Sequence, residues 1–317
     1  MSIKPLSFSS LRTVPLAKRK VDSDGHDFGA PYQAGSSFAD FLCSLPNLGA
    51  GSDLFLLRDA IVTARRHKHE VILACGSHVF ASGLSPLLSR LIEKRVVTGL
   101  ALTGAALLQD VEIALAGRTV AAQERELADG RFCMTEETGK LINEAIDLGA
   151  SENWGIGQSV GKHLMDAELE HLDHSVVATA FRYGVPVTVH PAIGADAFNL
   201  HPAAHGESIG AAGMTDLRLL AGMMAEANHG VVINIASSVV MPQVLLQAVD
   251  AARNLGKKVE SLTSAVIDAA ASSFAVNNVV TRLSQPGGRG IWIQGADEII
   301  VPLLFAAVME VLGKDSD

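Results

Sequence analysis

Residues 70–84 of the chain read EVILACGSHVFASGL, and this stretch contains the unit that decides the fold. Residues 71–74 form a short apolar run of strand length, as expected for a strand buried on both faces of a sheet. A turn of small residues, Gly76-Ser77-His78, follows the run, and an amphipathic helical pattern then covers residues 84–93. The order of strand, turn and helix predicts one unit of a parallel sheet with crossover helices.

The same unit recurs along the chain. Further apolar runs of strand length lie at 96–102, 185–189, 231–235, 259–262 and 291–293, and helical patterns lie at 106–116, 137–148, 175–183, 216–226, 242–254 and 298–312. This alternation predicts an α/β fold with a doubly wound, mostly parallel, Rossmann-like sheet. No internal repeat or low-complexity linker divides the chain. We therefore expect an N-terminal arm over 1–35 and a single domain over 36–317.

Composition narrows the class of protein. Of 317 residues, 48% are hydrophobic and only 19% are charged, which predicts a large core and a homo-oligomeric interface. The net charge of -9 disfavours a nucleic-acid partner. No apolar stretch of about 18 residues occurs, which disfavours a membrane-spanning helix. The cysteines, Cys43, Cys75 and Cys133, suggest neither a disulfide framework nor a zinc site, so we expect a reducing, cytoplasmic location.

Small residues follow most of the predicted strands. They occur in the segments Gly76-Ser77-His78, Thr103-Gly104-Ala105-Ala106, Ile193-Gly194-Ala195-Asp196, Ser237-Ser238 and Thr263-Ser264. In a doubly wound sheet such turns lie at the carboxyl edge, where backbone amides and helix N-termini approach phosphates. Asp110 follows one of these turns and is the best carboxylate candidate. The Gly-x-Gly-x-x-Gly fingerprint is absent, because Gly155-Ile156-Gly157 is followed by Val160 where the third glycine belongs.

A different class of site also has candidate residues. His190, His201 and His205 lie near Asp196 in one stretch punctuated by glycine and proline, so a metal-dependent hydrolase is an alternative. No His-Glu-x-x-His element supports it, and no Gly-x-Ser-x-Gly elbow supports a serine hydrolase. Metal ligation is accordingly not part of the favoured hypothesis.

The order of these segments resembles deoxyhypusine synthase over about residues 76–312. The similarity runs through Gly76–Leu84, the Thr103-Gly104-Ala105 turn up to Asp110, the middle stretch 185–240, and Gly295-Ala296-Asp297 before Val301-Pro302-Leu303-Leu304. The resemblance implies an NAD cofactor, a small-molecule substrate and a homotetramer with sites between subunits. It also implies which residues line the dinucleotide: Ser77, His78, Thr103, Gly104, Ala105, Asp196, Thr263, Ser264, Ala296 and Asp297.

The catalytic half of the family pattern is not matched. The family uses a lysine nucleophile, but the corresponding stretch here is Val280-Thr281-Arg282-Leu283, and no lysine lies between Lys258 and Lys314. An arginine stays protonated and cannot form the imine with the aminobutyl group. Transfer of that group to a protein lysine is therefore not expected. Arg282, His201 and Glu207 are the polar side chains we select for chemistry.

Three functional hypotheses follow. The first is an NAD-dependent transferase or oxidoreductase with a diverged substrate. The second is a dinucleotide-binding protein without catalysis, and the third is the metal-dependent hydrolase.

Overall fold

The computed structural model describes residues 3–120, 124–131 and 135–313, and the chain divides into two compact units, Met1–Ser52 and Asp53–Asp317. The first unit contains η1 (Leu16–Lys18), η2 (Gly25–Asp27) and α1 (Phe38–Ser44). Helix α1 starts with a capping box, in which the side chains of Ser37 and Asp40 each accept the other residue's backbone amide. The predicted end of the arm at residue 35 stays a prediction.

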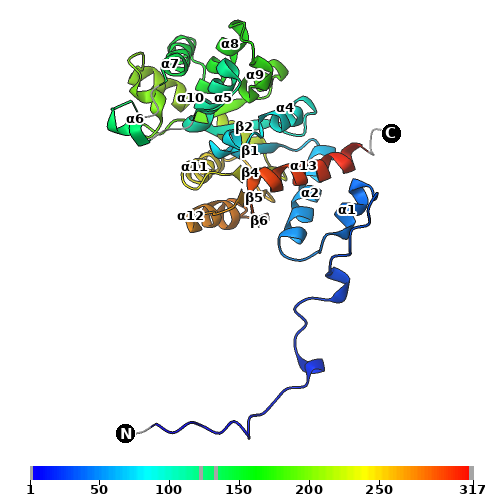
Figure 1. Ribbon diagram of the computed structural model, residues 1–317. Helices are drawn as coiled ribbons and strands as arrows, with labels where there is room; N and C mark the ends of the chain where they lie inside the picture. The colour runs from blue at the N-terminus through cyan, green and yellow to red at the C-terminus, as the bar shows by residue number, and fades with distance from the viewer. Residues whose placement is uncertain (1–2, 121–123, 132–134, 314–317) are drawn as a thin grey trace. The chain divides into compact units, whose positions relative to one another are not determined.

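The second unit is built on a six-stranded parallel sheet with the strand order β3-β2-β1-β4-β5-β6 (Figure 1). Its strands are β1 (Val71–Cys75), β2 (Gly99–Thr103), β3 (Val187–His190), β4 (Val231–Ile235), β5 (Thr263–Asp268) and β6 (Arg289–Gln294). Every neighbouring pair is parallel. The predicted doubly wound α/β fold is therefore confirmed.

Helices connect the strands and cover both faces of the sheet. They are α2 (Ala50–Arg66), α3 (His78–Ala81), α4 (Ser85–Glu93), α5 (Gly104–Ala116), α6 (Glu124–Ala128), α7 (Glu136–Ser151), α8 (Ile156–Asp166), η3 (Leu172–His174), α9 (Val176–Tyr183), η4 (Ala197–Leu200), α10 (Gly206–Glu226), α11 (Val240–Asn254), α12 (Ser273–Ala275), the π-helix η5 (Val276–Leu283) and α13 (Asp297–Gly313). None of the described helices is long and apolar enough to cross a membrane.

The alternation of side chains along the strands creates two cores. Val71, Leu73 and Cys75 of β1 pack into a cluster with α2, α4, α5 and α13, whereas Ile72 and Ala74 face α10, α11 and η5. Figure 1 shows α13 and α11 on opposite sides of the sheet. Both faces of β1 are fully buried, which explains why its sequence is a continuous apolar run.

The strand predicted over 259–262 is wrong, because β5 begins at Thr263. The apolar side chains of Val259 and Leu262 are buried, but they belong to the connection that enters the strand. In that connection the Arg253 guanidinium donates to the Val259 carbonyl, and Ser261 has a left-handed φ of 54°. Burial of a loop thus produced an apolar pattern that resembles a strand.

Two buried carboxylates join helices to the rest of the second unit. Asp216 of α10 accepts from the amides of Gly157 and Val189 at 3.1 and 2.8 Å, which ties the start of α8 to β3. Asp110 of α5 accepts from the Ser175 hydroxyl and from the Val176 amide at the start of α9. Burial raises the pKa of Asp216 to about 7 and that of Asp110 to about 6.

Candidate functional site

The carboxyl ends of the six strands form one continuous edge. Strand pairing places Thr103 beside His190, Cys75 beside Leu102 and Ile235, and Asp268 beside Gln294. After β1 the chain adds β2 and then β3 on one side of β1. Strand β4 pairs with the other side of β1, and β5 and β6 follow outward on that side. The order therefore reverses between β1 and β4. In open α/β sheets, the crevice at such a reversal is where ligands bind.

The turns after β1 and β4 lie against each other at this reversal. Gly76 donates its amide to the Ile235 carbonyl at 2.9 Å, and a Cβ at Gly76 would lie 1.9 Å from the Ala236 carbonyl oxygen. The β4 turn continues through Ser237, whose hydroxyl accepts from the Met241 amide at the start of α11. Only a glycine at position 76 permits this close approach of two backbones.

Asp268, which the sequence reasoning missed, ends β5 next to the β4 turn. One of its oxygens lies 3.5 Å from the Ser238 hydroxyl, and the other accepts from the Ala270 amide at 2.8 Å. The side chain is half-buried. The signal was the apolar run Ala265-Val266-Ile267 followed by an acid, which the misplaced strand concealed.

His78 and Asp297 meet at the same edge although 219 residues separate them in the sequence. His78 is the first residue of α3 after β1, and Asp297 is the first residue of α13 after β6. The His78 Nδ1 atom lies 2.9 and 3.1 Å from the two carboxylate oxygens of Asp297. Ser77 and Ala296 precede these two residues in the same turns, so all four of these predicted residues are at the carboxyl edge.

Asp196 lies against the start of α5. A Cβ at Gly104 would lie 2.1 Å from Asp196 Oδ2, and that oxygen accepts from the Ala192 amide at 2.7 Å. Burial raises the pKa of Asp196, and hydrogen bonds from the amides of Ala192 and Ala105 oppose that shift. Thr103 caps the same helix by accepting from the Ala106 amide. The N-terminus of α5 thus already has a carboxylate of this chain next to its amides.

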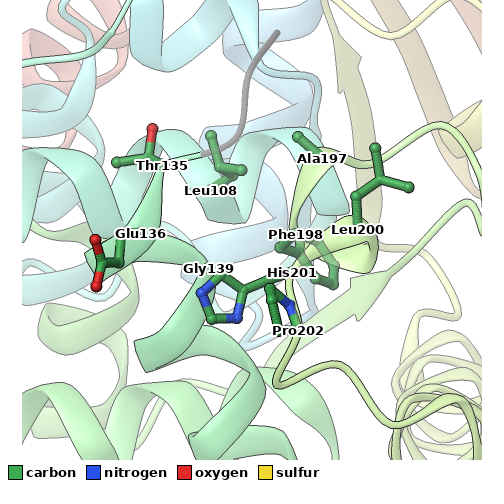
Figure 2. Close-up of a pocket in the computed structure, with 9 residues that line it drawn as sticks. All are labelled: Leu108, Thr135, Glu136, Gly139, Ala197, Phe198, Leu200, His201 and Pro202. Atoms are coloured by element: carbon green, nitrogen blue, oxygen red, sulfur yellow. The ribbon is translucent and has the colours of Figure 1, made fainter. Parts of the chain in front are cut away.

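A cavity of about 410 Å³ adjoins this contact (Figure 2). Its apolar lining includes Leu108, Phe198 and Leu200, and its polar lining comes from Thr135, Glu136 and His201. The His201 ring packs on Gly139 of α7, where a Cβ would approach the ring to 2.8 Å. Figure 2 shows Glu136 and Leu200 on opposite sides of the cavity. This composition suits a small molecule with an apolar part and a polar group.

The proposed histidine metal site does not assemble. His190 is buried, its Nε2 atom lies 3.0 Å from the Thr188 hydroxyl, and burial lowers its pKa to about 4. His205 pairs instead with Asp147 at 2.7 Å. Within the described ranges, the one group with three potential metal-ligating atoms within 4.8 Å of one another is His78, Asp297 and Glu298. The hydrolase hypothesis loses its geometric basis.

Several predicted site residues lie elsewhere. Thr263 and Ser264 begin β5 and are therefore at the amino edge, where the Ser264 hydroxyl donates to the Val279 carbonyl at 2.6 Å. Arg282 is exposed on η5 near the start of β6, and it donates to Asn278 Oδ1 at 3.2 Å. Thr263 and Ser264 were expected at the carboxyl edge because a strand was predicted over 259–262, and the observed start of β5 at Thr263 corrects that placement.

Two further predicted site residues are acidic. The Asp110 carboxylate is engaged inside the protein with the start of α9, as described above, because it lies on the buried side of α5. Glu207 lies in the first turn of α10, is exposed, and does not line the cavity that contains His201.

Two of the three cysteines, Cys43 and Cys75, lie in the described part of the chain. Cys43 and Cys75 are free thiols, and burial together with the nearby Asp297 carboxylate raises the pKa of Cys75 to about 12. Cys133 lies outside the described residues. Cys75 therefore acts as a small apolar side chain of the core.

No family model and no curated protein sequence matches this chain, but solved structures do. It is similar to AgrE in a ternary complex with ornithine and NAD+, with 16% identity, a TM-score of 0.53, and coverage of 86% of this chain and 35% of AgrE. It is also similar to a putative deoxyhypusine synthase from Entamoeba histolytica, with 15% identity, a TM-score of 0.53, and coverage of 89% and 96%.

A third similar structure is a conserved putative LOR/SDH protein from Methanococcus maripaludis S2, with 14% identity, a TM-score of 0.50, and coverage of 88% and 71%. The chain spans about a third of the length of AgrE. At these identities the comparisons establish a shared fold. The chain is an α/β protein with a deoxyhypusine-synthase-like fold, which confirms at the level of fold the resemblance found in the sequence.

Proposed function

We propose that this protein binds a nicotinamide dinucleotide across the carboxyl ends of β1, β4 and β5. The observation that carries the proposal is the reversal of strand order between β1 and β4, with the small-residue turns at Gly76 and Ala236 beside it. The shared fold with AgrE, whose complex contains NAD+, supports the choice of cofactor. The proposal rests on this combination and not on a glycine fingerprint, which the sequence lacks.

The donors and acceptors at this edge fit such a cofactor. Asp268 is a half-buried carboxylate next to the turn after β4, and a carboxylate at the end of a sheet strand can accept from ribose hydroxyls. Ser77 and Ser238 offer hydroxyl groups. They lie in turns of small residues, so a pyrophosphate can come close to the backbone amides. The cofactor would supply hydride exchange when bound, while these residues bind and orient it.

We further propose that the protein is an enzyme with a small-molecule substrate and that it does not make deoxyhypusine. The aminobutyl group needs a neutral amine as acceptor, and η5 presents Arg282 and no lysine. The cavity beside His201 is a candidate pocket for a small molecule, because it is mostly apolar and adjoins the strand-end turn of β3. NAD binding with no turnover of any substrate would favour the non-catalytic alternative.

Titration calorimetry of the full chain with NAD+ tests the cofactor proposal. Wild type is expected to bind NAD+, and Asp268→Ala is expected to bind it at least about 10-fold more weakly, since a lost hydrogen bond to a charged group costs about 1.5–3 kcal/mol. Asp250→Asn, an exposed carboxylate on α11, is the matched control and should leave the affinity within about 2-fold. Absence of any binding heat from wild type at millimolar NAD+ would rule out the site.

A further inference from the structure

His78 and Asp297 form a pair in which one side chain is exposed and the other is buried. The side chain of His78 is 61% exposed, whereas that of Asp297 is only 4% exposed. Ser82 adds a hydroxyl 3.1 Å from the same Nδ1 atom, and this hydroxyl also donates to the His78 carbonyl. The carboxylate is therefore fixed inside the protein and the imidazole extends from it toward solvent.

This arrangement fixes which ring nitrogen carries the proton. An ionised carboxylate only accepts hydrogen bonds, so the Nδ1 atom facing Asp297 must donate. In a neutral ring, Nε2 then holds the free lone pair. Asp297 is the first residue of the 17-residue helix α13, whose N-terminal peptide dipoles favour its negative charge. A fixed tautomer with an open Nε2 is the arrangement of a general base.

We propose that His78 is the acid–base residue of an NAD-dependent oxidation of an alcohol, with Asp297 as its positioning residue. The inference rests on the proposed function and adds the substrate class. In the reaction, the substrate O–H proton moves to His78 Nε2 while the hydride of the same carbon goes to the nicotinamide. The products are a carbonyl compound, NADH and an imidazolium that Asp297 stabilises and that returns its proton to water.

The need for a base points to a hydroxyl substrate. Once a hydride leaves an alcohol carbon, the oxygen must lose its proton, since a protonated carbonyl is strongly acidic. A neutral amine needs no base at that step, because its nitrogen lone pair expels the hydride and gives a stable iminium ion. A positioned imidazole acceptor thus fits alcohol oxidation better than amine oxidation.

The acidic groups around His78 also suit a different role, the binding of a metal ion. Glu298 lies in the same turn, and its carboxylate is within 4.8 Å of the ligand atoms of His78 and Asp297, so the three side chains could hold a divalent cation. An ion bound through Nδ1 would have to replace the proton that this atom shares with Asp297, whereas an ion bound through Nε2 would leave the hydrogen bond between His78 and Asp297 in place. Metal binding is therefore an outcome that the test must be able to reveal.

The test measures the reactivity of each histidine in the full chain toward diethyl pyrocarbonate by mass spectrometry, which needs no substrate. Two references are built into the protein. His67 is exposed and its Nδ1 faces the neutral Thr63 carbonyl, and His205, before α10, is paired with Asp147 of α7. We expect His78 to react several-fold faster than His67, and Asp297→Asn to remove that difference. Saturating NAD+ should slow labelling of His78 at least about 5-fold and leave His205 unchanged.

The outcomes separate this inference from the cofactor proposal. If NAD+ binds by calorimetry but His78 reacts no faster than His67, or reacts equally fast in Asp297→Asn, the acid–base role is wrong. If NAD+ does not bind, the cofactor proposal fails, while the comparison of wild type with Asp297→Asn still reports on the pair. Slower labelling of His78 in the presence of Zn²⁺ alone at micromolar concentration would favour the metal reading instead.

A second measurement tests the substrate class. NADH formation is followed with a panel of secondary alcohols and a matched panel of amines, using wild type and His78→Gln. Oxidation of an alcohol, with kcat reduced at least about 100-fold in the variant and the acidic limb of its pH profile lost, is the expected result. Oxidation of amines alone, or of no alcohol at all, would overturn the assignment.

Discussion

Replacing Gly76 with alanine is expected to lower the free energy of unfolding by about 2–4 kcal/mol and to weaken NAD binding at the same time. The added Cβ would lie 1.9 Å from the Ala236 oxygen and 2.7 Å from its carbonyl carbon. Both are backbone atoms of the β4 turn, so no side chain can move aside. The turn must shift, and with it Ser237 and Ser238 at the carboxyl end of β4. Urea denaturation and calorimetry with NAD+ measure the two effects.

Gly222→Ala is the matched control for this substitution. Gly222 lies within α10, and nothing lies within 4 Å of its ideal Cβ position. Alanine there should raise stability by about 0.5–1 kcal/mol, because it lowers the entropy of the unfolded chain and favours the helix. If Gly76→Ala were as stable as wild type, the close contact between the β1 and β4 turns would be wrong.

Asp216→Ala should cost about 3–5 kcal/mol of stability, because it leaves buried amide donors without an acceptor. The carboxylate accepts from Gly157 and Val189, and alanine can replace neither bond. Asp166→Ala is the control: Asp166 is exposed and pairs with Lys162, so its loss should cost less than about 1 kcal/mol. A loss below about 1 kcal/mol for Asp216→Ala would contradict the buried role.

The same variant should show a changed dependence of stability on pH. The pKa of Asp216 is raised to about 7 in the folded protein from 3.8 in its unperturbed state. Between these values the folded state holds a proton that the unfolded state has lost, so the proton-linked part of this residue's contribution to stability falls as pH rises and is lost above about pH 7. Denaturation at pH 5, 6 and 7.5 should therefore show a larger deficit for Asp216→Ala at pH 5. A deficit that grows with pH would contradict the raised pKa.

The sequence predicted the sheet well, because strands buried on both faces need uninterrupted apolar runs such as 231–235. It failed at β5, where the buried side chains of Val259 and Leu262 in a connection imitated a strand. That error moved Thr263 and Ser264 to the wrong edge and concealed Asp268. Periodicity reports burial, and burial alone does not separate a strand from a well-packed loop.

The site was predictable only in part. Small residues after strands identified the turns at Gly76 and Gly104, and the segment order placed His78 and Asp297 in one site. Their hydrogen bond could not be read from the sequence, since it depends on where the connection after β6 places the first residue of α13 relative to the turn after β1. Asp110 was misplaced because its distance along the chain from a turn does not reveal which side of α5 it occupies.

Hydrogen–deuterium exchange of the full chain with and without saturating NAD+ tests the central claim most directly, since it locates the cofactor on the sheet. We predict slower exchange in the turns at 76–78, 236–238 and 268–272, with no change at 259–264 or 287–289 on the opposite edge. Protection confined to the amino-edge segments, or no protection anywhere at millimolar NAD+, would contradict a dinucleotide site at the carboxyl ends of β1, β4 and β5.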